Sequence, residues 1–155
     1  MLVLALASDW AIDPKMSSVE FLGKSTLHDI HGKGGTLSGK LTVSDGSLAA
    51  AGEAEIPIVS LRTGNKGMDR NMYAMFEEKA FPRIALNIVS ADLSGIREGV
   101  DSPVVIHGVL VIHGVSKDVL IPAKIRLDHG RYVCEGSFSI SLKEYALKAP
   151  RLFLI

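Results

Sequence analysis

The chain has 155 residues, of which 47% are hydrophobic, which predicts one globular domain with a substantial core and excludes an intrinsically disordered protein. Seventeen basic residues balance seventeen acidic ones, so the overall charge gives no sign of binding to nucleic acid or to an anionic membrane. The single cysteine, Cys134, excludes an internal disulfide and a cysteine-based metal cluster, and its alternating surroundings predict a buried position.

The first residues are apolar and end in Ala5-Leu6-Ala7, the small-x-small pattern of a signal-peptidase site. The run lacks a positively charged start and is shorter than a complete signal core. We therefore expect residues 1–7 to be the remnant of an export signal, and residues 8–155 to form a single periplasmic or secreted domain. A short first strand, a disordered end and a cytoplasmic location stay open as alternatives. No apolar stretch reaches the length of a transmembrane helix.

Apolar and polar residues alternate in three runs before residue 62, which predicts half-buried antiparallel strands at residues 17–28, 36–44 and 47–61. Asp45-Gly46 favours a hairpin turn between the second run and the third, because both residues tolerate positive φ. Pro57 has no backbone N–H, so it predicts an edge, a bulge or a bend near the end of the third run.

Residues 60–82 have helical rather than strand character. Met72, Met75 and Phe76 share one face at helical spacing, and methionine adapts to irregular apolar shapes. We expect a helix laid against the sheet as a plug or lid, with ordinary core packing as the open alternative for each of these side chains.

The ends of this helix are predicted from its flanking residues. Asp69 is the predicted N-cap, and Met68 just before it would pack on Tyr73 as a hydrophobic staple. Pro82 restricts the residue before it to an extended conformation, so the helix should end by about Ala80.

Four more strand-like runs follow, at residues 83–93, 104–112, 119–128 and 131–142. The run 104–112 is apolar on both faces and should be covered on both sides. Seven such runs with hairpin turns and one helix indicate an all-β antiparallel barrel or sandwich. An eight-stranded barrel is just wide enough to be filled by its own side chains or to hold one small ligand.

Several motifs, in order and spacing, carry a resemblance over residues 10 to about 147. They are Trp10-Ala-Ile-Asp-Pro14, Ser18-Val-Glu-Phe21, Ser60-Leu-Arg-Thr-Gly-Asn65 with Met68-Asp69 and Phe81-Pro82, Gly108-Val-Leu-Val-Ile-His-Gly-Val-Ser-Lys117 and, more weakly, Phe138-Ser-Ile-Ser-Leu-Lys-Glu-Tyr145. Together they resemble the YceI-like, polyisoprenoid-binding family. The resemblance implies a lipocalin-like barrel of about eight strands that binds isoprenoid or quinone-like lipids and catalyses nothing.

The chain departs from the family pattern in two places. Leu142 stands where the family commonly has an arginine, and the family usually adds a final strand after the point where this chain stops. Residues 151–155 read like a strand cut short. A barrel without its closing strand exposes backbone N–H and C=O groups on two strands. We therefore expect a homodimer that pairs these edges or buries residues 151–155, or otherwise an aggregation-prone monomer.

The apolar interior can accept an aliphatic chain. With the resemblance, this implies a non-enzymatic carrier or storage protein for a long-chain isoprenoid, a quinone-like lipid or another amphiphile. Burial of an aliphatic chain contributes about 0.8 kcal/mol per CH₂. We expect no cofactor apart from such a lipid, and no nucleic-acid partner. The side chains that would shape the mouth and hold the helix are Arg62, Thr63, Asn65 and Asp69. The expected ligand-binding residues are Phe21, Leu37, Leu41, Ile56, Ile58, Thr63, Asn65, Met68, Asp69, Met72, Met75, Phe76, Ile84, Leu86, Ile121, Ile125, Phe138 and Ile140.

Two alternatives stay open. The first is a histidine-based, metal-dependent small hydrolase. His28 and His31 point to opposite faces of a strand, while His107 and His113 share a face but stand about 20 Å apart. A metal site would therefore need cross-strand partners such as His28 with His107, and we expect none. The second alternative is a structural or interaction module whose barrel is filled by its own side chains.

Overall fold

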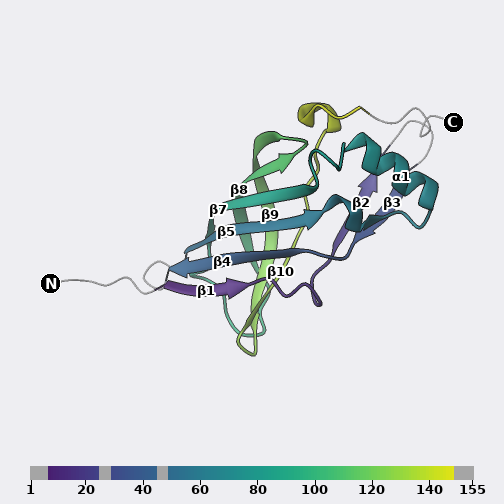
Figure 1. Ribbon diagram of the computed structural model, residues 1–155. Coiled ribbons are helices and arrows are strands. Elements are labelled where there is room, and N and C mark those ends of the chain that lie inside the picture. The colour runs from purple at the N-terminus through teal and green to yellow at the C-terminus, as the bar shows by residue number, and fades with distance from the viewer. Residues whose placement is uncertain (1–6, 25–28, 45–48, 149–155) are drawn as a thin grey trace.

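The computed structural model describes residues 7–24, 29–44 and 49–148, which form two antiparallel sheets and one helix (Figure 1). The predicted Asp45-Gly46 turn, His28, and residues 1–6 and 151–155 lie outside the described residues. The all-β antiparallel class and the single helix are confirmed for the described part of the chain. No helix within that part is long and apolar enough to span a membrane.

The larger sheet has seven strands in the order β1-β4-β5-β7-β8-β9-β10. They are β1 (Ala7–Ala11), β4 (Ser38–Ser44), β5 (Ala49–Pro57), β7 (Arg83–Asp92), β8 (Ser102–Ile112), β9 (Val115–Asp128) and β10 (Arg131–Gly136). The sheet curls into a half-barrel, so that β10 passes behind β1 in the view of Figure 1. Within the described residues, β1 and β10 are its two edges and share no ladder.

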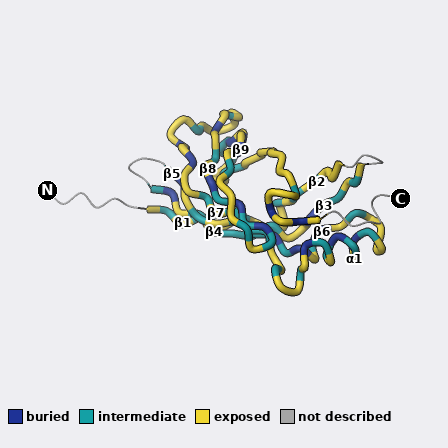
Figure 2. The backbone as a smooth tube through the Cα atoms, turned by 90° about the horizontal axis from the view of Figure 1, so that it is seen from above, coloured by how far each residue is buried: buried dark blue, intermediate teal, exposed yellow. Residues whose placement is uncertain are grey.

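A smaller sheet and the helix lie together at one end of the molecule, and β1 lies at the other end (Figure 2). The sheet has the strand order β2-β3-β6, and the helix α1 follows β6. The bounds are β2 (Val19–Gly23), β3 (Ile30–Gly34), β6 (Leu61–Arg62) and α1 (Lys66–Met75), with 3₁₀ turns η1 (Ile58–Ser60) and η2 (Leu142–Tyr145). Pro57 ends β5 and starts η1, so the predicted bend occurs where the chain leaves the larger sheet.

Strand register fixes which residues face the inside of the half-barrel, because directly opposed residues of antiparallel strands point to the same side. One row crosses six strands between Trp10 on β1 and Val119 on β9. Its members, in spatial order, are Trp10, Leu41, Gly52, Ile88, Gly108 and Val119. Large and small side chains alternate from Leu41 onward, so the glycines leave room between their neighbours.

Two clusters contain nearly all the buried apolar residues, one on each side of this row. The helix-end cluster contains Ile56, Ile58, Leu61, Met72, Phe76, Leu110, Ile112, Tyr145 and Leu147. The loop-end cluster contains Val43, Ala50, Ala91, Leu93, Val104, Ala123 and Ile125. The first binds α1 and η2 to the sheet, and the second holds the loop of residues 93–101 against it.

The predicted start of the helix is wrong, whereas its end lies within the predicted limit. The N-cap is Asn65, whose side chain accepts a hydrogen bond from Met68 N at 3.0 Å, so Asp69 lies within the helix. Met68 therefore does not precede the N-cap, as the predicted hydrophobic staple requires. The helix ends at Met75, before the predicted limit of about Ala80. Glu77 takes a left-handed φ of 50°, and Glu78 N donates to Tyr73 O at 3.1 Å, the six-to-one bond of a Schellman motif.

Three strand predictions also need correction. Only one face of β8 is buried, because Val105 on the other face is 50% exposed. The strand expected over residues 131–142 ends at Gly136, and the next five residues are irregular. Cys134 is exposed rather than buried, because it lies on the edge strand β10 with no strand beyond it among the described residues.

Candidate functional site

The inner face of the half-barrel carries an apolar surface between the two clusters that other side chains cover only in part. Leu41, Ile88 and Val119 in the inner row are each half-buried, although all three point inward. The glycines between them present no side chain. We call these residues, with Ile106 and Cys134, the inner apolar surface; Ile106 and Cys134 oppose the buried Ile121 and Ile125.

The open side of this surface is the seam between the edge strands β1 and β10. The rings of Trp10 and Tyr132 meet across the seam, with their centroids 4.7 Å apart at an interplanar angle of 63°. A second contact joins Arg131 Nη1 to Met16 Sδ at 2.7 Å. The seam is therefore bridged by side chains rather than by a backbone ladder.

Cys134 shows that the inner face beside the seam is accessible. Its residue is exposed, although the protein atoms around the thiol desolvate it and raise its pKa above the ordinary value. These two observations fit a side chain at the wall of a concave surface that solvent can reach.

The connection before α1 is held by a buried carboxylate. Asp69 is 5% exposed, and its Oδ1 accepts hydrogen bonds from Thr63 N and from Thr63 Oγ1, each at 2.7 Å. Tyr73 adds a bond from its hydroxyl to Leu61 O at 2.6 Å. These bonds, together with the Asn65 cap, hold the start of the helix. Arg62 is exposed, and the predicted role of these residues at a ligand mouth stays a prediction.

The structure distributes the other predicted site residues over three environments. Phe21, Ile56, Ile58, Met72, Met75, Phe76, Ile84 and Leu86 belong to the helix-end cluster or pack against it. Ile125 lies in the loop-end cluster, and Ile121 is buried on the same strand. Leu37, Leu41 and Met68 are half-buried, while Asn65, Phe138 and Ile140 are exposed. Most of the predicted set therefore forms the ends of the half-barrel, and few members line its open middle.

Sequence reasoning missed several residues of the seam and the inner row. Trp10, Ile88, Val119 and Cys134 were outside the predicted site, although Ile88 and Val119 stood in the predicted alternations. The missing signal was the pairing of strands far apart in the chain, which brings Trp10 opposite Leu41 and next to Tyr132.

The histidines within the described residues lie apart from one another. His31 and His107 are exposed, and His113 contacts the Glu77 carboxylate and Tyr145 O, the latter at 3.2 Å. These two contacts of His113 hold the β8–β9 hairpin against the end of α1 and against η2. Because His28 lies outside the described residues, the predicted alternative of a site with His107 has no described partner.

Glu98, Asp128 and His129 are the group of described residues with metal-ligand geometry, with donor atoms within 4.8 Å of one another. They already bond among themselves: His129 N donates to Glu98 Oε1 at 2.9 Å, and its ring lies 2.6 Å from Asp128 Oδ1. The hydrogen bond and charge of Asp128 raise the pKa of His129. Together with the bond from Gly99 N to Leu127 O at 2.8 Å, these contacts latch the 93–101 loop to the β9–β10 turn.

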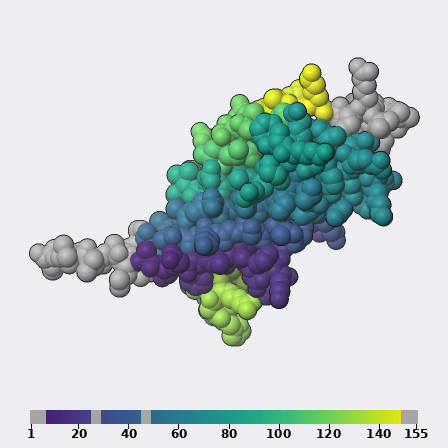
Figure 3. Space-filling view, viewed as in Figure 1, coloured from purple at the N-terminus to yellow at the C-terminus, as the bar shows by residue number. Residues whose placement is uncertain are grey.

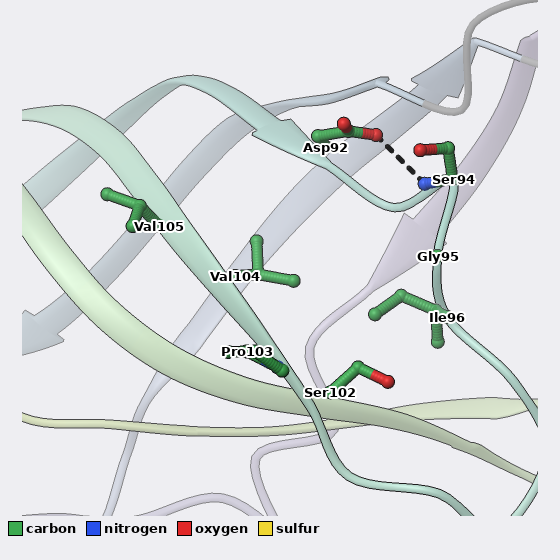
Figure 4. A pocket seen from close by; sticks show the side chains of 8 residues that line it. All are labelled: Asp92, Ser94, Gly95, Ile96, Ser102, Pro103, Val104 and Val105. Carbon is green, nitrogen blue, oxygen red and sulfur yellow. Dashed lines mark hydrogen bonds between the residues drawn. The ribbon is translucent and has the colours of Figure 1, made fainter.

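Beside this loop lies a half-open hollow of about 420 Å³ (Figure 4). Asp92, Ser94 and Ser102 contribute polar groups, and Ile96 and Val104 contribute apolar ones. A hydrogen bond from the Ser94 side chain and a second from Ser94 N, which donates to Asp92 Oδ1 at 2.9 Å, lower the pKa of Asp92. Figure 3 shows the β9–β10 turn, in yellow-green, below β1, in purple. The hollow lies at the loop end and is distinct from the inner apolar surface.

Comparison with solved structures gives the same fold. A polyisoprenoid-binding domain from Saccharophagus degradans superposes with a TM-score of 0.73 at 19% identity, covering 97% of this chain and 86% of that one. BcnA of Burkholderia cenocepacia gives a TM-score of 0.65 at 15% identity over 91% and 81% of the two chains. The YceI protein of Campylobacter jejuni gives 0.61 at 19% identity over 88% and 82%.

Among curated protein sequences, none matches this chain significantly. A family model, however, matches nearly its whole length, from residue 10 to residue 154, and its description is the YceI-like domain. The motifs, the curled antiparallel sheet and this match agree, and the chain belongs to the YceI-like domain family.

Proposed function

We propose that the protein binds the apolar chain of an isoprenoid or quinone-like lipid on the inner apolar surface, as a carrier or store and without catalysis. The observation that carries the proposal is a set of inward-facing apolar side chains that the fold leaves half-covered: Leu41, Ile88 and Val119. The similarity to a polyisoprenoid-binding domain from Saccharophagus degradans supports the choice of ligand class.

The hydrophobic effect is large enough for such binding. Burial of about ten carbons, two isoprene units, contributes about 8 kcal/mol at about 0.8 kcal/mol per CH₂. This free energy corresponds to a Kd of about 1 μM before the cost of ordering the ligand is subtracted. A longer chain adds further burial, so a long isoprenoid binds more tightly than a short one.

Native mass spectrometry after gentle purification tests the proposal. We expect a species heavier than the 16.6 kDa chain by the mass of one lipid, and lipid extraction should return the protein to 16.6 kDa. Added isoprenoid quinone should then restore the heavier species. A chain that purifies at 16.6 kDa and takes up no added quinone would contradict the proposal.

We propose in addition that the protein is exported, and that two copies associate. The Ala5-Leu6-Ala7 pattern supports export, and cell fractionation with an antibody against the chain tests it.

The edge strands β1 and β10 support the association of two copies through edge pairing. Light scattering coupled to size-exclusion chromatography, with and without residues 151–155, should give a dimer that weakens on truncation. A stable 16.6 kDa monomer in both forms would contradict it.

A further inference from the structure

Trp10 occupies the seam of the half-barrel on its inner side. It stands on β1 opposite Leu41 and packs against the loop-end cluster. Its ring meets that of Tyr132 on β10 in a T-shaped contact. The indole therefore lies at the point where the inner apolar surface meets the open side of the half-barrel.

The indole Nε1 of Trp10 is covered from solvent, and none of the residues that the structure describes gives it a hydrogen-bond acceptor. An indole N–H can only donate. Buried donors are nearly always paired, so an unpaired one needs a specific explanation. A contact of the N–H with the face of the Tyr132 ring would be much weaker than a bond to oxygen.

The surroundings explain why the protein itself supplies no acceptor. The side chains of the loop-end cluster, such as Val43, Ala123 and Ile125, are apolar. The inner face beside the seam is nevertheless reachable, because Cys134, two residues after Tyr132, is exposed. Tyr132 lies on an edge strand and is only half-buried, and its ring is in contact with the indole, so it is a neighbour of Trp10 that can move to admit a ligand.

We propose that the Trp10 indole N–H determines the specificity of the inner apolar surface by donating a hydrogen bond to an oxygen at the polar end of the bound lipid, such as a quinone carbonyl. This inference rests on the proposed function. A lipid with an acceptor oxygen pairs the N–H, whereas a pure hydrocarbon leaves it unpaired. A site with a buried donor rejects ligands that cannot pair it.

The test compares two ligands on two proteins by isothermal titration calorimetry. The ligands are an isoprenoid quinone and squalene, an isoprenoid hydrocarbon without oxygen, and the proteins are the wild type and Trp10→Phe. Phenylalanine keeps a ring against Tyr132 but removes the donor, so lost packing weakens both ligands alike. Lost donation should weaken the quinone by a further five- to tenfold or so.

The outcomes separate the two proposals. If Trp10→Phe weakens quinone and squalene by the same factor, the hydrogen bond is refuted while lipid binding stands. If neither ligand binds the wild type, the proposed function itself fails.

A second measurement needs no variant. The chain has one tryptophan, so ¹⁵N labelling gives a single indole N–H signal in the NMR spectrum. Saturating quinone should move that signal downfield and slow its exchange with solvent, and squalene should do neither. Equal shifts with both ligands would overturn the inference even if Trp10→Phe failed to fold.

Discussion

Replacement of Asp69 by alanine should destabilise the protein strongly, because this carboxylate anchors the chain segment that leads into α1. Asp69 is 5% exposed and accepts two hydrogen bonds of 2.7 Å from Thr63. A hydrogen bond to a charged group contributes about 1.5–3 kcal/mol, and Thr63 is half-buried, so water can satisfy it in part after the change. We therefore expect Asp69→Ala to lower the free energy of unfolding by about 3 kcal/mol.

The assay is thermal unfolding followed by far-ultraviolet circular dichroism. A chain of this size loses about 2–4 °C of Tm per kcal/mol, so Asp69→Ala should melt about 6–12 °C below the wild type. The matched control is Asp118→Ala, an exposed aspartate on β9, which should stay within about 0.5 kcal/mol of the wild type. If the two variants melt at the same temperature, the Asp69–Thr63 bonds do not anchor the helix.

Three further predictions follow from packing and exposure. Gly39→Ala should lower the free energy of unfolding by about 1–3 kcal/mol in a urea titration, because the added Cβ would lie 2.1 Å from Glu53 O. The control Gly35→Ala, whose Cβ would have nothing within 4 Å, should leave the stability unchanged. Equal urea midpoints for the two variants would refute the clash. Met72→Ala should lower the free energy of unfolding by about 2–4 kcal/mol, because Met72 is 5% exposed in the helix-end cluster. Met75→Ala should lower it clearly less, because Met75 is half-buried. The reverse order would contradict the packing of α1. Cys134 has a raised pKa, so it should react with iodoacetamide more slowly at pH 7.5 than an unhindered thiol and faster at higher pH, where the thiolate forms. Bound quinone should protect it from the reagent. Mass spectrometry measures both the rates and the protection, and an absence of protection would argue against a lipid beside β10.

Local sequence patterns predicted a strand face well where the alternation of apolar and polar residues alone decides which face is buried. The alternations around Leu41, Ile56 and Ile125 reflect one buried and one solvated strand face, and the structure places all three on the inner side. The pattern failed at the helix start because Asn65 and Asp69 are both good N-caps. Thr63 decides between them, since it occupies the Asp69 carboxylate and leaves Asn65 to cap.

Other features depend on contacts between distant segments and could not be read locally. The run 104–112 carries apolar residues on both faces, yet the sheet has only one covered face there, so Val105 is exposed. The exposure of Cys134 depends on β10 being an edge strand, and the Trp10–Tyr132 contact depends on the curl of seven strands. The latch of Glu98 on His129 joins residues that pattern analysis had no reason to pair.

The most direct test of lipid binding on the inner face is a fluorescence titration of Trp10 with an isoprenoid quinone. Quinones quench tryptophan, and Trp10 is the only tryptophan of the chain. Leu41→Gln and Thr42→Gln make the same change on opposite faces of β4, since Leu41 faces inward opposite Trp10 and Thr42 is exposed. An unpaired amide against the lipid chain costs about 2 kcal/mol, so Leu41→Gln should weaken binding about thirtyfold and Thr42→Gln should leave it unchanged. Equal affinities in the two variants, or no saturable quenching of the wild type, would contradict binding on this surface.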